Sequence, residues 1–225
     1  MTLELQLVLL AWGTLVGLDL ISVPQMMIAR PVVAGPVAGA ILGDVATGLA
    51  LGVVFELFQY DILPLGAARY PEYGPATVAA VSAAQAGAGT FGLGFGVLVG
   101  LTTGLVGGVS LHLVHRLNAR AVEAAVPALE AGDPRVLVRL HVAGIVRDGA
   151  RAALVTGVGL VLAQLVRVFL AGAYTLRGVA GLAVAGVAGA LAVGTAGTLR
   201  RVGRGTALRW FAAGLAGGTV VAWLS

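Results

Sequence analysis

Apolar runs separated by short polar breaks dominate this chain. One run extends from about Leu3 to Met27, with Asp19 as the only charge beyond its first turn. Another, from Tyr73 to His115, contains no Asp, Glu, Arg or Lys and would be about 65 Å long as a single helix. Because about 20 apolar residues cross a bilayer, the pattern predicts transmembrane helices at about 3–27, 76–88, 92–114, 153–173, 178–199 and 207–224.

The run from Arg30 to Tyr60 has a different character. It carries Asp44 and Glu56 and is interrupted by two prolines and several glycines, so a single straight helix accounts for it poorly. A polar, proline-bearing stretch follows at 61–75. Irregular backbone at membrane depth persists only where protein or a water-filled cavity satisfies its polar groups. The pattern therefore predicts a broken or re-entrant element around residues 30–68.

Composition supports an all-α protein embedded in lipid. Hydrophobic residues make up 59% of the 225 residues and charged residues 11%, against about a quarter charged in soluble domains. The net charge of +4 comes from arginines in the gaps between apolar runs, which indicates cytoplasmic membrane flanks rather than a nucleic-acid-binding surface. The opening Met-Thr-Leu-Glu is acidic, so we expect residues 1–23 to remain in the mature protein and not to act as a cleaved signal peptide.

Residues 116–151 form the one extended hydrophilic segment and predict a pair of surface helices broken at Asp133-Pro134. Two predicted crossings separate this segment from a basic cluster at 200–209, so the positive-inside rule places both on the cytoplasmic face. We expect a single membrane domain, 1–225, that forms a polytopic transmembrane helical bundle. Its expected parts are a broken-helix region at 1–75, glycine-rich helices at 76–115, the polar cytoplasmic-face segment at 116–151 and C-terminal transmembrane helices at 152–225.

Three carboxylates inside the apolar runs are candidates for function. An ionisable side chain in hydrocarbon is costly unless it is paired or hydrated, and such groups usually mark a substrate or ion path. Asp44 and Glu56 would lie about 120° apart on an unbroken helix, but a re-entrant element can bring both to one cavity. For Asp44 the alternative is a helix N-cap, because Gly-Asp before an apolar run is a common cap pattern. Asp19 lies nearer a membrane boundary, and a structural role is the alternative there.

Glycines recur along one side of a predicted helix, every four residues, at Gly92, Gly96, Gly100, Gly104 and Gly108. Small residues in such a stripe let a neighbouring helix approach closely. A shorter stripe of Gly181, Ala185 and Gly189 predicts the same kind of packing. The Gly-x-Gly-x-x-Gly match at 87–92 lacks the βαβ context of a dinucleotide site. With no cysteine and no nucleophile arrangement in the chain, we predict no catalytic residue, no metal site and no cofactor.

Several linked motifs between residues 30 and 68 resemble one transporter family. An Arg-Pro at 30–31 is followed by Leu-Gly-Asp-x-x-Thr-Gly at 42–48, Phe-Glu at 55–56 and Leu-Gly-Ala-Ala at 65–68. Their order and spacing resemble the IIC subunit, the membrane permease component, of the mannose/fructose/sorbose-type phosphotransferase system. The chain departs from the better-known members in being short and in having Pro-Gln-Met before the Arg-Pro, where those members carry an acidic, Phe-containing stretch.

The resemblance implies a sugar-translocating subunit of the bacterial inner membrane that binds a hexose-like sugar and presents it for phosphorylation by IIB. It also implies an IID membrane subunit, a trimer of IIC–IID pairs, and cytoplasmic IIA and IIB subunits that carry the phosphate. The phosphoryl-transfer residue is then expected on IIB and not on this chain. The substrate-binding residues expected by carry-over are Glu56, Asp44 and Thr47, with Gln25 and Asp61 as weaker candidates.

Two other functions fit the same residues. A proton-coupled secondary transporter would use Asp19 and Glu56 and would need no phosphoryl donor. A non-transporting membrane partner or sensor, derived from a IIC ancestor, would use the glycine stripes for assembly alone.

Overall fold

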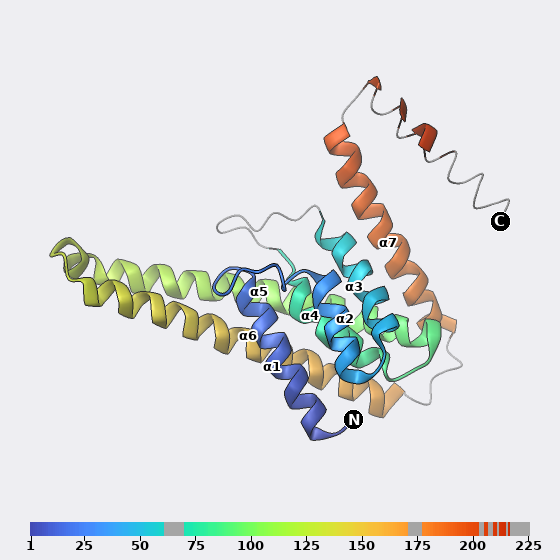
Figure 1. Ribbon diagram of the computed structural model, residues 1–225, viewed down its shortest axis with the longest axis horizontal. Helices are drawn as coiled ribbons and strands as arrows, with labels where there is room; N and C mark the ends of the chain where they lie inside the picture. The colour runs from blue at the N-terminus through green and yellow to red at the C-terminus, as the bar shows by residue number, and fades with distance from the viewer. Residues whose placement is uncertain are drawn as a thin grey trace.

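The computed structural model describes residues 1–60, 70–170 and 177–202, with isolated positions between 205 and 216. No strand occurs among these residues, which confirms the all-α fold. Figure 1 shows the helices of the described ranges in chain order: α1 (Leu3–Asp19), α2 (Pro31–Leu42), α3 (Val45–Gln59), α4 (Tyr73–Ala84), α5 (Gly89–Glu130), α6 (Pro134–Leu170) and α7 (Arg177–Val202).

The segment predicted to be broken forms a tight hairpin of α2 and α3. α2 begins at Pro31, whose fixed φ and missing N–H suit the first turn of a helix. It ends at Gly43, which adopts the left-handed conformation (φ 79°), and Asp44 then caps α3 by accepting a hydrogen bond from the Thr47 N–H at 3.0 Å. With 12 and 15 residues, the two helices are about 18 and 22 Å long, too short to cross a bilayer alone. The predicted break is confirmed between α2 and α3, whereas 61–68 lie outside the described residues.

Glycines keep the two helices of the α2–α3 hairpin in backbone contact. A side chain at Gly35 would collide with the carbonyl of Gly48, and a side chain at Gly52 would collide with the carbonyl of Pro31. Small residues at a helix interface permit this approach and the van der Waals contacts that come with it. The hairpin therefore packs as one unit.

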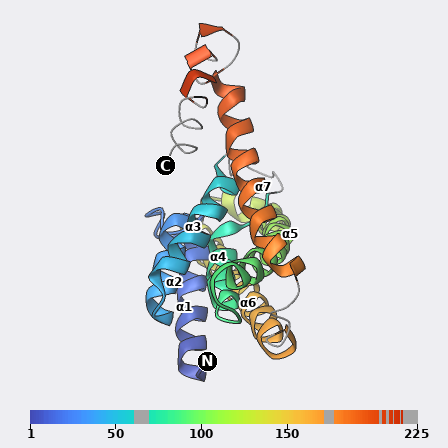
Figure 2. The ribbon, with the colours of Figure 1, turned by 90° about the vertical axis from the view of Figure 1, so that its right-hand side faces the viewer.

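α4 lies at the centre of the bundle. All twelve of its residues are buried, and it packs against α1, α2, α3, α5 and α6. Figure 2 shows it enclosed by these neighbours. The sequence predicted two helices in this region, at 76–88 and 92–114, and the structure has two. The first, however, is a short core helix surrounded by protein, and the second continues as far as Glu130.

The glycine stripe of α5 faces α4 and the α2–α3 hairpin. A Cβ added along it would meet Leu51 at Gly96, Phe55 at Gly100, Tyr73 at Gly104 and the backbone of Tyr70 at Gly108. These contacts confirm that the stripe serves close helix packing. The shorter stripe predicted on α7 is confirmed only at Gly189, where a Cβ would lie 3.5 Å from the Phe58 ring of α3. A Cβ at Gly181 would meet nothing within 4 Å, and the glycine of α7 that approaches α5 is Gly186, which faces Val97.

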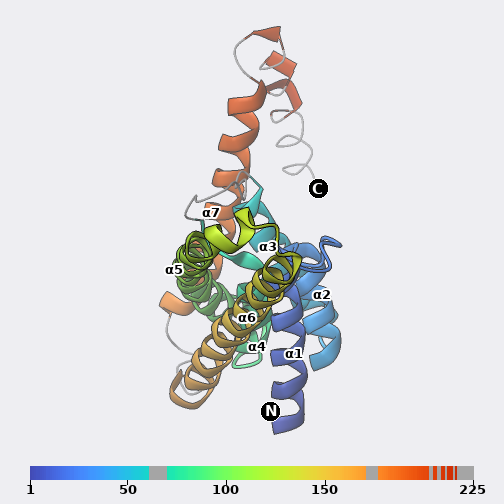
Figure 3. The same cartoon turned by 90° about the vertical axis from the view of Figure 1, so that its left-hand side faces the viewer.

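α5 and α6 form a long hairpin that projects from the other helices (Figures 1 and 3). With 42 and 37 residues, they are about 63 and 55 Å long. Within the described ranges they are the two helices long and apolar enough to cross a membrane singly. Gly132 (φ 76°) and Asp133, which accepts the Arg135 N–H at 2.9 Å, form the turn between them. The predicted break at Asp133-Pro134 is confirmed, but the two surface helices are the outer halves of α5 and α6 and not separate elements.

Candidate functional site

Ionisable side chains gather at one end of the bundle, which we call the ionic end. Here α1 ends, α2 begins, α3 ends and α4 begins, and the middle of α6 passes beside them. The charged residues tied into hydrogen bonds at this end are Asp19, Arg30, Glu56, Glu72, Asp148 and Arg151.

Glu56 joins the two open ends of the α2–α3 hairpin. Its Oε1 accepts hydrogen bonds from the Arg30 guanidinium, with the Nε donor at 2.5 Å, and its Oε2 accepts the N–H of Val32 at 3.2 Å. Val32 lies in the first turn of α2, where the N–H groups have no partner within the helix and the helix dipole favours a negative charge. The Glu56 side chain is 15% exposed and that of Arg30 is 48% exposed. The carboxylate is therefore fixed in position while its edge is still reachable.

Asp44 and Thr47 lie at the opposite end of α3. Glu56 is twelve residues along from Asp44, a rise of about 18 Å in an α-helix. The Asp44 carboxylate accepts the Thr47 N–H, so the N-cap alternative describes its geometry. The hypothesis that Asp44 and Glu56 line one cavity is wrong, because the hairpin turns at Gly43 and leaves them at its two ends.

Of the two weaker candidates, the structure describes only Gln25. Gln25 is exposed in the loop between α1 and α2, and its side-chain amide donates to the Ile21 carbonyl at 3.0 Å. The structure shows it bonded only to its own loop. Asp61 lies outside the described residues.

Asp19 organises the same loop. It is 3% exposed, and its two oxygens accept the N–H groups of Met26 at 2.6 Å and Ala29 at 3.0 Å. Two residues of this loop, Gln25 (φ 58°) and Met27 (φ 64°), adopt left-handed backbone conformations, which residues other than glycine rarely adopt. The Asp19 carboxylate stabilises this unusual backbone by accepting hydrogen bonds from N–H groups near these two residues. These contacts agree with the alternative that Asp19 has a structural role.

Arg151 is the centre of a buried ionic network. The guanidinium pairs with both oxygens of Glu72, with Nη2 to Oε1 at 3.0 Å, and its Nε donates to Asp148 at 2.8 Å. It also donates to the Gly17 carbonyl at 3.3 Å, and the Ser22 hydroxyl donates to Asp148 at 2.6 Å. Buried charges persist when they are paired and hydrogen-bonded in this way. The network ties α6 to the end of α1, to the following loop and to the start of α4.

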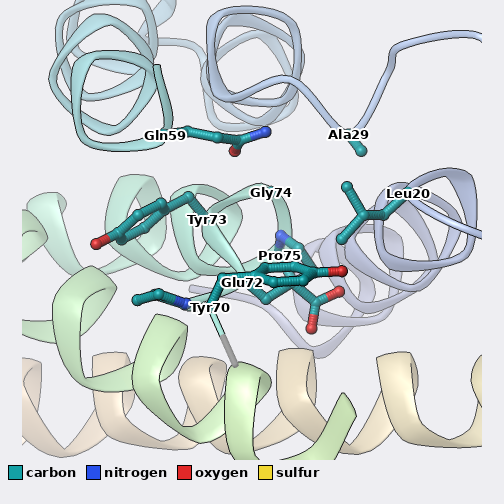
Figure 4. A pocket seen from close by; sticks show the side chains of 9 residues that line it. Leu20, Ala29, Gln59, Tyr70, Glu72, Tyr73, Gly74 and Pro75 are labelled. Carbon is teal, nitrogen blue, oxygen red and sulfur yellow. The ribbon is translucent and has the colours of Figure 1, made fainter. Parts of the chain in front are cut away.

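A small cavity lies beside this network (Figure 4). It has a volume of about 10 Å³, which is room for about one water molecule. Gln59, Tyr70, Glu72 and Tyr73 line it together with apolar residues. A hexose does not fit between these side chains in this conformation.

The comparison with protein families identifies the chain. A family model described as the sorbose-specific IIC component of a phosphotransferase system matches residues 4–222. The match extends far beyond the motif-bearing residues 30–68. This chain belongs to that family.

Curated relatives of this IIC-family chain are sorbose- and mannose-specific components. The sorbose-specific EIIC component of Klebsiella pneumoniae is 30% identical over 125 residues, which is 56% of this chain and 46% of the relative. The mannose-specific EIIC component of Escherichia coli K12 is 26% identical over the same shares. The sorbose-specific EIIC component of Lacticaseibacillus casei is 25% identical over 145 residues, covering 64% of this chain and 51% of the relative. The chain thus spans about half the length of the curated relatives it matches.

Two solved structures share the fold of this IIC-family chain. One, described as a membrane protein, aligns with a TM-score of 0.78 at 21% identity, over 97% of this chain and 87% of the other. A second belongs to a cryo-EM complex of the mannose transporter ManYZ with microcin E492 and aligns with a TM-score of 0.58 at 19% identity over the same shares. The fold is that of polytopic α-helical membrane proteins.

The sequence did not reveal the buried network. The sequence places Asp148 and Arg151 in a hydrophilic surface segment, but they are 2% and 4% exposed, because the inner half of α6 runs beside α1 and α4. The sequence places Glu72 in a polar loop, but this residue is 1% exposed. One signal was available. Asp148 and Arg151 are three residues apart, so they share one side of a helix, and apolar residues follow immediately.

Proposed function

We propose that this chain is the sugar-translocating IIC subunit of a sugar phosphotransferase system. The observation that carries the proposal is the α2–α3 hairpin, built from the family-matching motifs and closed at its mouth by the Arg30–Glu56 pair. Short paired helices of this kind provide polar backbone and side chains at membrane depth without exposing them to lipid. Membership of the IIC family supports the same assignment.

The proposed substrate is a hexose-like sugar, and Glu56 is its proposed ligand. An ionised carboxylate accepts hydrogen bonds from two neighbouring hydroxyls, and charge-assisted bonds are the stronger ones. Arg30 and the Val32 N–H hold the Glu56 carboxylate in position. The proposed role of Asp44 and Thr47 is to stabilise the hairpin turn, where the Asp44 carboxylate accepts the Thr47 N–H. Gln25 and Asp61 stay weaker predictions.

The proposed partners follow from the family. We propose that the chain pairs with a IID subunit in the bacterial inner membrane, as a trimer of such pairs. Cytoplasmic IIA and IIB subunits would supply the phosphate, with the phosphoryl-transfer residue on IIB. The cavity of about 10 Å³ at the ionic end is too small for a sugar, so sugar binding at this cavity requires either a movement of its walls or surfaces contributed by IID.

The proton-coupled alternative has less support, because the Asp19 carboxylate it requires is occupied by two backbone N–H groups. Sugar uptake by cells that express the chain with its IID, IIA and IIB subunits separates the possibilities. We expect uptake to depend on the phosphocarrier protein and to persist in the presence of a protonophore. Uptake that is abolished by the protonophore and indifferent to loss of the phosphocarrier would instead establish a secondary transporter. No uptake and no sugar binding, even with IID present, would establish a non-transporting partner.

A further inference from the structure

One face of the outer half of α6 is apolar and uncovered. Val138, Val142 and Val146 recur every fourth residue and are 62%, 52% and 63% exposed. Residues four apart lie one above another on a helix, so the three form a continuous line, which we call the valine stripe. Together with Arg135 and Arg139, these residues line a shallow depression of about 740 Å³.

The apolar exposure continues along α6 toward its C-terminal end, at Leu154, Val161 and Leu165. A helix of 37 residues is about 55 Å long, whereas the hydrocarbon core of a bilayer is about 30 Å thick. An upright α6 would carry much of this apolar line into water. A steeply inclined α6 keeps it in contact with lipid.

The course of the α5–α6 hairpin agrees with an inclined position. In Figure 1 the hairpin crosses α1, α2 and α3 at a steep angle and projects sideways from them. If the axes of those helices lie near the bilayer normal, the outer half of the hairpin runs along the membrane surface. The valine stripe then lies at the level where lipid headgroups meet acyl chains.

The positive charges on this face favour anionic lipids. Arg135 and Arg139 are four residues apart and exposed, and neither has a salt-bridge partner in the described part of the chain. No Asp or Glu occurs from Pro134 to Arg147. Long arginine side chains extend from an apolar face to the phosphates of the membrane surface, and anionic lipids strengthen that attraction. A second copy docked by two-fold symmetry would instead present the same two arginines and no acidic side chain from this stretch.

We propose that the valine stripe binds anionic phospholipid, with acyl chains against Val138, Val142 and Val146 and a headgroup phosphate against Arg135 and Arg139. The outer half of α6 is then an interfacial helix that anchors the α5–α6 hairpin to the membrane surface. This proposal is independent of the sugar-transport function.

The chain contains no cysteine, so a single Val142→Cys variant accepts one environment-sensitive fluorophore. The full chain is reconstituted into vesicles of phosphatidylcholine with or without phosphatidylglycerol, and acyl chains brominated at known depths serve as quenchers. We expect strong quenching by bromines near the headgroup end of the acyl chain, stronger when the brominated lipid is phosphatidylglycerol. The double variant Arg135→Gln/Arg139→Gln should weaken the preference for phosphatidylglycerol on the order of thirtyfold, because each of the two arginines near an anionic surface contributes about 1 kcal/mol.

The matched control is Arg116→Gln/Arg120→Gln, which removes the same charge from exposed positions on α5 that do not line the depression. It should leave the lipid preference of the Val142 label unchanged. An equal loss of the preference for phosphatidylglycerol in this control would show that the preference depends only on the total charge of the protein, and this would overturn the proposal. Absence of quenching by brominated lipid would also overturn it, and so would oxidative disulfide cross-linking of the unlabelled Val142→Cys variant between two copies of the chain.

Discussion

Glu56 is the carboxylate whose surroundings best suit substrate handling. It is fixed by Arg30 and by the first turn of α2, and yet part of it is exposed. Asp19 has the same side-chain chemistry, but both its oxygens are buried against backbone donors. The two acids thus differ in what remains accessible after pairing.

Replacing Glu56 with Gln should lower sugar uptake on the order of tenfold at equal expression, because a neutral amide makes weaker hydrogen bonds and loses the Arg30 ion pair. Uptake of labelled sugar by cells that express the variant with its partner subunits measures the effect. Glu123→Gln, an exposed change on α5, is the control and should keep normal uptake. Normal uptake in the Glu56→Gln variant would remove this residue from the site.

At the scale of elements, the α2–α3 hairpin is defined by its turn. Gly43 supplies the left-handed conformation, and Asp44 caps α3. Glycine contacts then hold the two helices together. These features place Glu56 at the mouth and Asp44 at the turn, so the two acids lie at opposite ends of the hairpin.

Two substitutions of Asp44 separate capping from a role in transport. Asn also caps helices well, so Asp44→Asn should keep both stability and uptake, whereas Asp44→Ala should lower the free energy of unfolding by about 1 kcal/mol. The thermal unfolding midpoint of the purified protein and sugar uptake by cells are the two measurements. Loss of uptake in Asp44→Asn with an unchanged unfolding midpoint would show that the charge itself acts in transport.

At the scale of the whole molecule, the Arg151 network joins segments that are far apart in sequence. Arg151 and Asp148 on α6 meet Glu72 before α4, Ser22 after α1 and the Gly17 carbonyl. The network lies where the inner half of the long α6 meets the compact bundle. It therefore fixes the α5–α6 hairpin relative to the ionic end.

The substitution Arg151→Gln should destabilise the protein by about 3–5 kcal/mol, because it leaves buried carboxylates without their cation. The double variant Glu72→Gln/Arg151→Gln should be less destabilised than the single one, since one uncompensated charge is removed with the guanidinium. The thermal unfolding midpoint in a fixed detergent measures both, with exposed Arg120→Gln as the control. Wild-type stability of the Arg151→Gln variant would contradict this role for the network.

The sequence alone determined the solvent and the class of the protein. Its long apolar runs and few charges require lipid around a helical bundle, whatever the packing. Local rules were also sufficient for the break before Pro134 and for the glycine stripe of α5, since each depends on residues close together in the chain, and they offered the Asp44 cap as one of two alternatives. The linked motifs of residues 30–68 were enough to predict the family, because their order and spacing are sequence properties.

Tertiary structure alone decided which charges are buried and which meet. Arg151, Asp148 and Glu72 look like surface residues in the sequence, and they form a core network because α6 continues past the hydrophilic segment into the bundle. Likewise, α4 is apolar enough to be taken for a crossing but is enclosed by other helices. Hydropathy reports whether a residue avoids water, but it does not distinguish lipid from protein as the surroundings. That distinction, and with it the separation of Glu56 from Asp44, depends on contacts between segments distant in the chain.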